Sequence, residues 1–338
     1  MLVHSVGHFA YMGLWRHLAA PDFDVNDFKA YYTAALAVRT GQADRFLYSD
    51  PGLMNLGLLP EQPWVQFAVA NGIPHPSAYI YPPFFAVALA PLTLMDYHTA
   101  NQAWFGLNTL LLAGSILLLV RLAALPWPGV PTAGGVSPAR AGGGAMAAAC
   151  VVFVSLNFFP TIRAMQCGQA GPLLLLLTTV GLYAALRGRD ALAGGALAIA
   201  AAVKLTPAIL LVYLWWAGRR RAALWGAGVL VLLTLVAVFA AGWDNHVRYA
   251  SEFVPTLSKG AATYANQSIN GALNRLLTGA SMAQFEFSQE PALVRFLTRA
   301  IGLLLLGAAL FIARPRARET SPGSRLALGY GLVTLTTL

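Results

Sequence analysis

The chain has 338 residues, of which 57% are hydrophobic and only 10% are charged. An ordinary soluble domain carries about 25% charged residues. The composition therefore excludes a typical soluble globular protein and predicts an all-α, polytopic integral membrane protein. The net charge of +9 is not gathered in one basic tract, which argues against nucleic acid as a partner.

Apolar runs that can cross a bilayer recur along the chain, since a span needs about 20 residues. The predicted spans, at least five, are Ala103 to Leu125, Ala145 to Phe159, Gly171 to Leu186, Ala222 to Ala241 and Phe296 to Ala313. We expect a single membrane domain over residues 1–338. The chain stops inside an apolar run, so we expect truncation at the carboxyl end and leave truncation at the amino end open.

Short arginine clusters separate the apolar runs and predict the topology. They comprise Arg187 and Arg189, then Arg219 to Arg221, then Arg314, Arg316 and Arg318. Arginine at span ends marks the cytoplasmic side. The two long polar stretches, residues 21–80 and 242–291, are then extracytoplasmic loops of a multi-pass protein in the plasma or inner membrane, and the chemistry faces outward.

The stretch from Ala191 to Gly218 lies between two basic clusters. As one helix it would be about 42 Å long and would place the second cluster outside. We favour a hairpin of two short helices, because Pro207 disfavours helix at the preceding residue. This places the turn near Lys204 in the membrane or at its outer edge.

Two further segments give less certain patterns. Residues 83–95 contain Pro91 and form either a short span or a re-entrant piece. Between Asp27 and Thr40, apolar and aromatic residues recur at helical spacing, which predicts an interfacial helix with its aromatic face toward lipid.

The two cysteines are far apart in the predicted topology. Cys150 lies inside a predicted span and Cys167 beyond its outer end, so we expect neither a disulfide nor a metal site.

Charged groups in this setting are candidates for chemistry. Asp27 is either a helix cap or a general base toward a hydroxyl. Lys204 is either a snorkelling lysine or, with the hairpin, a ligand for an anionic head group together with Arg163. Asp22 and Asp24 form a D-x-D pattern, but matches this short are frequent by chance, and we expect no metal.

Aromatic and amide residues have two interpretations as well. Tyr79, Tyr81 and Trp64 are typical of a membrane-border aromatic belt, and aromatic rings also stack on sugars. The amides of Asn266, Gln267 and Asn270, with Arg275, would supply donors to hydroxyls or phosphate from an outer loop.

Together these signatures resemble glycosyltransferase family 87, polyprenyl-phosphate-sugar-dependent membrane enzymes of the GT-C fold that include actinobacterial mannosyltransferases. The resemblance runs from Asp27 to about Arg275. The residues that carry it are Asp27-Phe28 with Tyr31-Tyr32 and Ala34-Ala35, Tyr81-Pro82-Pro83, Gly168-Gln169, Ala193-Gly194, Lys204-Leu205-Thr206-Pro207, and Asn266-Gln267-Ser268 with Gly271.

The resemblance implies a hexosyltransferase that moves a sugar, expected to be mannose, from polyprenyl phosphate to a hydroxyl of a lipid or glycan acceptor with inversion. Asp27 would be the general base. Lys204, Arg163 and Arg275 would bind the donor phosphate. The expected substrate-binding residues are Tyr31, Tyr32, Tyr81, Gln169, Asn266, Gln267 and Asn270. The donor arrives activated, so no nucleotide, cofactor or metal is expected.

Two other functions compete with this hypothesis. A transporter or flippase of lipid-linked sugars also needs a polar-lined membrane cavity, although the long outer loops and the lack of matching halves argue against it. A noncatalytic membrane subunit would leave Asp27 and Lys204 dispensable.

Overall fold

The computed structural model describes residues 2–11, 27–48, 60–124, 143–257, 259, 262–264, 266–282, 291–314 and 322–336. Across these ranges the regular structure is helical and includes no strand, which confirms the predicted all-α class. The helices are α1 (Leu2–Phe9), α3 (Phe28–Arg39), α4 (Ala43–Phe46), α5 (Pro63–Ala70), α6 (Pro83–Leu89), the 3-10 helix η3 (Ala90–Leu94), α7 (Tyr97–Ala123), α8 (Gly143–Asn157), α9 (Phe159–Gln166), α10 (Gly171–Leu186), α11 (Asp190–Val203), α12 (Ala208–Trp216), α13 (Arg220–Ala241), α14 (Trp243–Arg248), the π-helix η5 (Tyr249–Phe253), α15 (Val254–Leu257), α16 (Ile269–Thr278), α17 (Ala292–Ile312) and α18 (Pro322–Thr336).

Three helices in the described ranges, α7, α13 and α17, are long and apolar enough to cross a membrane. A fourth span is possible in the bent pair α8 and α9, whose axes differ by 49°. Pro160 stands at the start of α9, where its ring cannot continue the helix above it. Helix α10 is shorter than a full span, because it has only 16 residues, about 24 Å of helix. Within the described ranges, up to four of the five predicted spans therefore have membrane-crossing length.

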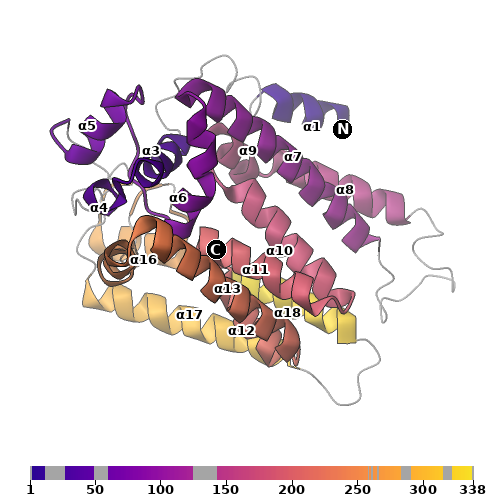
Figure 1. Ribbon diagram of the computed structural model, residues 1–338. Helices are drawn as coiled ribbons and strands as arrows, with labels where there is room; N and C mark the ends of the chain where they lie inside the picture. Colours follow the sequence, from indigo (N-terminus) through magenta and orange to yellow (C-terminus); the bar gives the residue numbers. More distant parts are fainter. Residues whose placement is uncertain are drawn as a thin grey trace, which may run out of the picture.

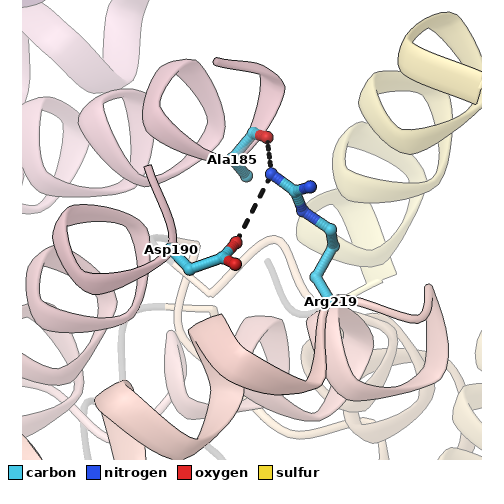
Figure 2. A network of polar contacts seen from close by, with 3 residues as sticks. All are labelled: Ala185, Asp190 and Arg219. Atoms are coloured by element: carbon cyan, nitrogen blue, oxygen red, sulfur yellow. Dashed lines mark hydrogen bonds and ion pairs between the residues drawn. The ribbon is translucent and has the colours of Figure 1, made fainter. Parts of the chain in front are cut away.

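The hairpin predicted between the two arginine clusters is confirmed. Helix α11 ends at Val203 and α12 begins at Ala208, with the Lys204 turn between them. At the far end, a guanidinium Nη2 of Arg219 lies 3.4 Å from a carboxylate oxygen of Asp190 and donates a hydrogen bond to the carbonyl of Ala185. Figure 2 shows these three residues joining the ends of α10, α11 and α13. The chain therefore leaves this end along α11 and returns to it along α12.

Helix α17 ends at the same end of the molecule. A guanidinium Nη1 of Arg325 on α18 donates to the carbonyl of Ile312 at 3.1 Å, and Gly323 lies beside the Leu186 side chain at the end of α10. The described members of all three arginine clusters thus share one end, as the topology predicts. In Figure 1 the short helices α3 to α6 gather toward the left of the view, and the turns that bear arginine lie at the lower right.

Helix α3 does not lie along a lipid surface. Every residue from Phe28 to Val38 is buried, because α6, η3 and α7 pack around it. Phe28 stacks on Trp104 of α7 with ring centroids 5.7 Å apart, and the Tyr31 ring packs edge-on against Phe85 of α6 at 4.9 Å. The interfacial prediction for this helix is therefore wrong: its aromatic residues form part of the largest buried cluster.

Residues 83–94, predicted as a short span or a re-entrant piece, form two short consecutive helices. Helix α6 has seven residues and passes directly into the five-residue η3, which contains Pro91. Together they are too short to cross a bilayer core of about 30 Å. They pack between α3 and α13 and so position Tyr81 and Pro82 beside α3.

Two glycines bring α11 and α13 into close contact. A Cβ added at Gly194 on α11 would lie 2.0 Å from the carbonyl oxygen of Ala222 on α13, and one added at Gly226 on α13 would lie 3.0 Å from the carbonyl oxygen of Gly194. Small residues allow helix backbones to approach in this way in membrane proteins. The contact fixes α11, and with it the Lys204 turn.

Candidate active site

The candidate site is built where the start of α3 meets the loop between α9 and α10. The backbone N–H of Asp27 donates to the carbonyl of Cys167 at 2.8 Å. The indole N–H of Trp104 donates to the carbonyl of Gly168 at 2.7 Å. Gly168 has φ of +60°, a conformation that glycine adopts without strain. These bonds hold Gln169 next to Asp27.

Asp27 does not cap its helix. It occupies the N-cap position of α3, but its side chain makes no capping hydrogen bond, so the structure contradicts the cap interpretation. Burial raises the pKa of the Asp27 carboxyl above its usual value, while the Gln169 side chain, Lys204 and Arg163, in that order, lower it. Residues from α9, the following loop and the end of α11 therefore act on one carboxylate.

The two cations near Asp27 are not paired with it. Lys204 is exposed, and its interaction with Asp27 is electrostatic without a direct ion pair. Arg163 is half-buried, and its Nη1 donates to Oε1 of Gln166 at 3.4 Å. Two cations thus act on one carboxylate without an ion pair to it, so their charges are available to an anionic ligand.

A pair of tyrosines lines the other side of Asp27. The hydroxyl of Tyr31 donates to the hydroxyl of Tyr81 at 2.8 Å, and their rings meet edge-on with centroids 4.9 Å apart. Burial, chiefly, and the charge of Asp27 raise the pKa of both hydroxyls. Both stay protonated at neutral pH. Because the Tyr31 hydroxyl proton is donated to Tyr81, the half-buried Tyr81 hydroxyl is the one suited to donate a hydrogen bond to a sugar hydroxyl.

The aromatic-belt interpretation is wrong for two of its three residues. Tyr79 and Trp64 are each only 1% exposed. The hydroxyl of Tyr79 donates to the carbonyl of Pro82 at 2.8 Å. The indole N–H of Trp64 donates to the backbone carbonyl of Ser77 at 3.1 Å. Both side chains are therefore held inside the protein, and they support the segment that carries Tyr81.

Other predicted site residues have local partners in the structure. The hydroxyl of Tyr32 donates to the carbonyl of Met95 at 2.7 Å, which anchors α3 to the end of η3. The Nη1 of Arg275 donates to the carbonyls of Thr263 at 3.1 Å and Asn266 at 2.8 Å. The guanidinium thus fixes the loop before α16. Its role toward phosphate stays a prediction.

The Asn-Gln-Ser signature forms the beginning of α16. Oδ1 of Asn266 accepts from the hydroxyl of Ser268 at 2.6 Å, and that hydroxyl accepts from the N–H of Gly271 at 3.3 Å as the N-cap. The amide of Gln267 donates to the carbonyl of Tyr264, and the carbonyl of Asn270 accepts from Asn274 at 3.1 Å. Substrate binding by these amides stays a prediction.

Four residues named in the sequence analysis, Asp22, Asp24, Arg316 and Arg318, lie outside the described residues.

Sequence reasoning missed two residues that position the site. Trp104 lies within a span, where an indole N–H needs a partner, and that need is its sequence signal. Tyr48 has φ of +57°, which is uncommon for a residue with a side chain. Its hydroxyl donates to the carbonyl of Tyr81. No sequence pattern marked Tyr48.

An apolar hollow of about 620 Å³ adjoins the site. It opens between α6, α11, α13 and η5, and Leu205 of the Lys204 turn lies in its wall beside Pro82. Its other wall residues include Phe84, Ala201, Ala202, Leu230, Thr234, Ala237, His246 and Tyr249. The hollow therefore places apolar-lined space beside the Lys204 turn.

The sequence of the chain matches a known family over residues 79–338. The family model that covers this range is described as glycosyltransferase family 87. The chain belongs to glycosyltransferase family 87. This confirms the resemblance and favours an enzyme over a transporter. Asp27 to Tyr32 lie outside the range that the family model covers, so the role of Asp27 rests on its position in the structure.

Two curated relatives agree with the family 87 assignment. The chain is 32% identical over 206 residues to a polyprenol-phosphate-mannose-dependent alpha-(1-2)-phosphatidylinositol mannoside mannosyltransferase of Mycolicibacterium smegmatis, covering 60% of this chain and 45% of the relative. It is 29% identical over 204 residues to a polyprenol-phosphate-mannose-dependent alpha-(1-2)-phosphatidylinositol pentamannoside mannosyltransferase of Mycobacterium tuberculosis, covering 60% and 43%. The chain thus spans less than half the length of either relative. No solved structure gave a significant match.

Proposed function

We propose that this chain is a membrane mannosyltransferase. It moves a mannosyl group from polyprenyl phosphate to a hydroxyl of a phosphatidylinositol-type glycolipid. Membership of family 87 and the printed activities of its relatives support the reaction class. The observation that carries the proposal for this chain is that Gln169, Lys204 and Arg163 all act on the buried Asp27 carboxyl.

Asp27 acts as the general base. The acceptor hydroxyl oxygen attacks the anomeric carbon from the face opposite the phosphate, and its proton passes to the Asp27 carboxylate as the new bond forms. The bond between the anomeric carbon and the phosphate oxygen breaks in the same step, which inverts the configuration. Burial raises the pKa of Asp27, and this makes it a stronger base than an exposed aspartate.

Lys204 and Arg163 stabilise the departing phosphate. Negative charge grows on the phosphate oxygen as the bond breaks, and fixed cations in a water-poor site act most strongly on such charge. Neither cation is neutralised by an ion pair with Asp27. Because a monophosphate can be met by two such cations, we propose that transfer needs neither metal nor cofactor.

The polyprenyl chain lies in the 620 Å³ hollow beside Leu205. Its apolar wall suits a prenyl chain, and its position next to the Lys204 turn places the attached phosphate at the cations. The arginine clusters share the opposite end of the bundle, which the positive-inside rule assigns to the cytoplasm. We therefore propose that transfer occurs on the extracytoplasmic face of the cell membrane.

The test is transfer by the purified full chain in lipid nanodiscs that contain polyprenyl-phosphate-mannose and phosphatidylinositol mannoside, with products identified by mass spectrometry. Asp27→Asn should lower transfer about 10²- to 10⁴-fold while leaving donor binding intact. Asp244→Asn is the matched control, because Asp244 is an exposed carboxylate on α14. Transfer that survives Asp27→Asn would remove Asp27 from this role, and a wild-type chain without transfer would contradict the proposed function.

A further inference from the structure

A second hollow lies on the other side of the Lys204 turn. Its volume is about 450 Å³, and it opens between α12, α17 and α18. Ile209, five residues beyond Lys204, forms part of its wall, whereas Leu205 belongs to the hollow described above. The two hollows therefore flank one short segment of chain.

The second hollow is apolar apart from one cation and one hydroxyl. Its wall consists of Ile209, Arg299, Gly302, Leu303, Leu306 and Thr336. Arg299 belongs to α17, a helix long and apolar enough to span the membrane. Ionisable groups within such segments are rare and mark functional sites by default.

Arg299 makes no polar contact with the part of the chain that the structure describes. Within the described ranges its guanidinium makes no hydrogen bond or ion pair, and the same is true of Arg295 one turn earlier on the same helix face; both are exposed. Like charges four residues apart on a helix destabilise it slightly. An anion bound at this face would relieve that repulsion, and the apolar wall below would hold hydrocarbon.

The position along α17 places Arg299 away from the arginine-rich end. Arg314 follows α17 at that end, about 22 Å of helix from Arg299. The cations that act on Asp27 are Lys204 and Arg163, and Arg299 is not among them. Arg299 is therefore distinct from the cations that act on Asp27 and from those of the arginine-rich end.

We propose that this hollow binds the acceptor: the phosphodiester of an anionic glycerophospholipid pairs with Arg299, and an acyl chain lies along Leu303 and Leu306. The role as acceptor site rests on the proposed function. Transfer between two lipids needs two hydrocarbon sites. In a phosphatidylinositol mannoside the attacked sugar hydroxyl lies apart from the phosphate, so a phosphate site separate from Asp27 is what the acceptor requires.

Gly302 provides a variant that fills the hollow without removing the charge. No atom lies within 4 Å of the position that a Cβ would take at Gly302. Leucine there can extend into the hollow without displacing backbone, and it favours helix more than glycine does. Gly302→Leu and Arg299→Gln thus block the site by independent means. Arg314→Gln removes the same charge from the other end of the helix and is the control.

The experiment measures binding of short-chain lipids to the purified full chain in detergent, with no turnover required. The probes are dioctanoyl phosphatidylinositol and, as a stand-in for the donor, farnesyl phosphate. We expect Arg299→Gln and Gly302→Leu each to weaken phosphatidylinositol binding about tenfold or more, with farnesyl phosphate unchanged and Arg314→Gln without effect on either.

Two results would overturn the inference. Unchanged phosphatidylinositol affinity in both variants would mean that Arg299 merely snorkels to the membrane border. Weakened farnesyl phosphate binding with phosphatidylinositol unaffected would assign the hollow to the donor. The binding readout also separates the two proposals: a chain that binds phosphatidylinositol through Arg299 but transfers no sugar contradicts the proposed function alone.

Discussion

The two ends of α11 use charge in opposite ways. At its first residue, Asp190 pairs with Arg219 at 3.4 Å, and Arg219 also satisfies the carbonyl of Ala185. At the other end, Lys204 is exposed and influences Asp27 without a direct ion pair. The charges at the Asp190 end form an ion pair, whereas those at the Lys204 end do not.

The difference separates charges that hold the fold from charges that serve a ligand. The Asp190–Arg219 ion pair fixes which helix ends meet, as a buried ion pair does for specificity in some proteins. Lys204 and Arg163 are not paired with Asp27, so both cations can interact with a bound phosphate. Changes at the two ends of α11 should therefore affect different measurements.

Lys204→Gln should have the larger effect and should act on the donor. Loss of a charged hydrogen-bond donor to phosphate costs about 1.5–3 kcal/mol, so we expect donor affinity to fall about 10- to 100-fold in a lipid-binding titration. Lys204 also lowers the pKa of Asp27. Without it that pKa rises, the base is protonated at higher pH, and the acid limb of transfer activity shifts to higher pH.

Arg221→Gln is the matched control for Lys204→Gln, because Arg221 is an exposed cation at the arginine-rich end. It should leave donor affinity and the pH profile unchanged. Equal loss of affinity in both variants would mean that general positive charge, rather than the Lys204 position, attracts the donor.

Arg219→Ala should lower stability and spare chemistry. The pair is partly exposed, with side chains 30% and 25% accessible, so its loss should cost about 1–3 kcal/mol, between exposed and fully buried pairs. Thermal unfolding in detergent should show a lower midpoint, while transfer per folded molecule stays near that of the unaltered chain. Loss of transfer with an unchanged midpoint would erase the contrast between the two ends.

Gln169→Met should have the smallest effect, confined to the pH profile. The Gln169 amide is the strongest of the groups that lower the pKa of Asp27, and methionine keeps its size without the hydrogen bond. The pKa should rise, so half-maximal transfer moves to higher pH, with a similar plateau. Gln66→Met, at an exposed position on α5, should leave the profile in place; a coincident profile for Gln169→Met would show that Gln169 does not tune the base.

Much of the open end of α11 could be predicted from the sequence. The arginine clusters fixed which helix ends meet, and Pro207 located the break, so Lys204 had to lie far from the basic end. Arg163 and Gln169 follow from the same topology, because they precede a helix that runs back to the arginines. These predictions depend on chain direction and helix length, which a sequence states directly.

Other features depend on packing, which a sequence does not state. Tyr79 and Trp64 have the residue types of a membrane belt, yet the loops enclose them. Helix α3 has an aromatic face, and α6, η3 and α7 bury its other faces as well. The carbonyl partners of Arg275 come from a loop whose path no pattern reveals.

The central claim is that one phosphate lies between Lys204 and Arg163 with its sugar toward Asp27. An electron cryo-microscopy map of the Asp27→Asn chain in nanodiscs with polyprenyl-phosphate-mannose tests it most directly. The account predicts phosphate density in contact with both cations, prenyl density in the hollow beside Leu205, and the anomeric carbon facing position 27. Phosphate density at Arg275 or Arg299, with the space between Lys204 and Arg163 empty of donor, would contradict it.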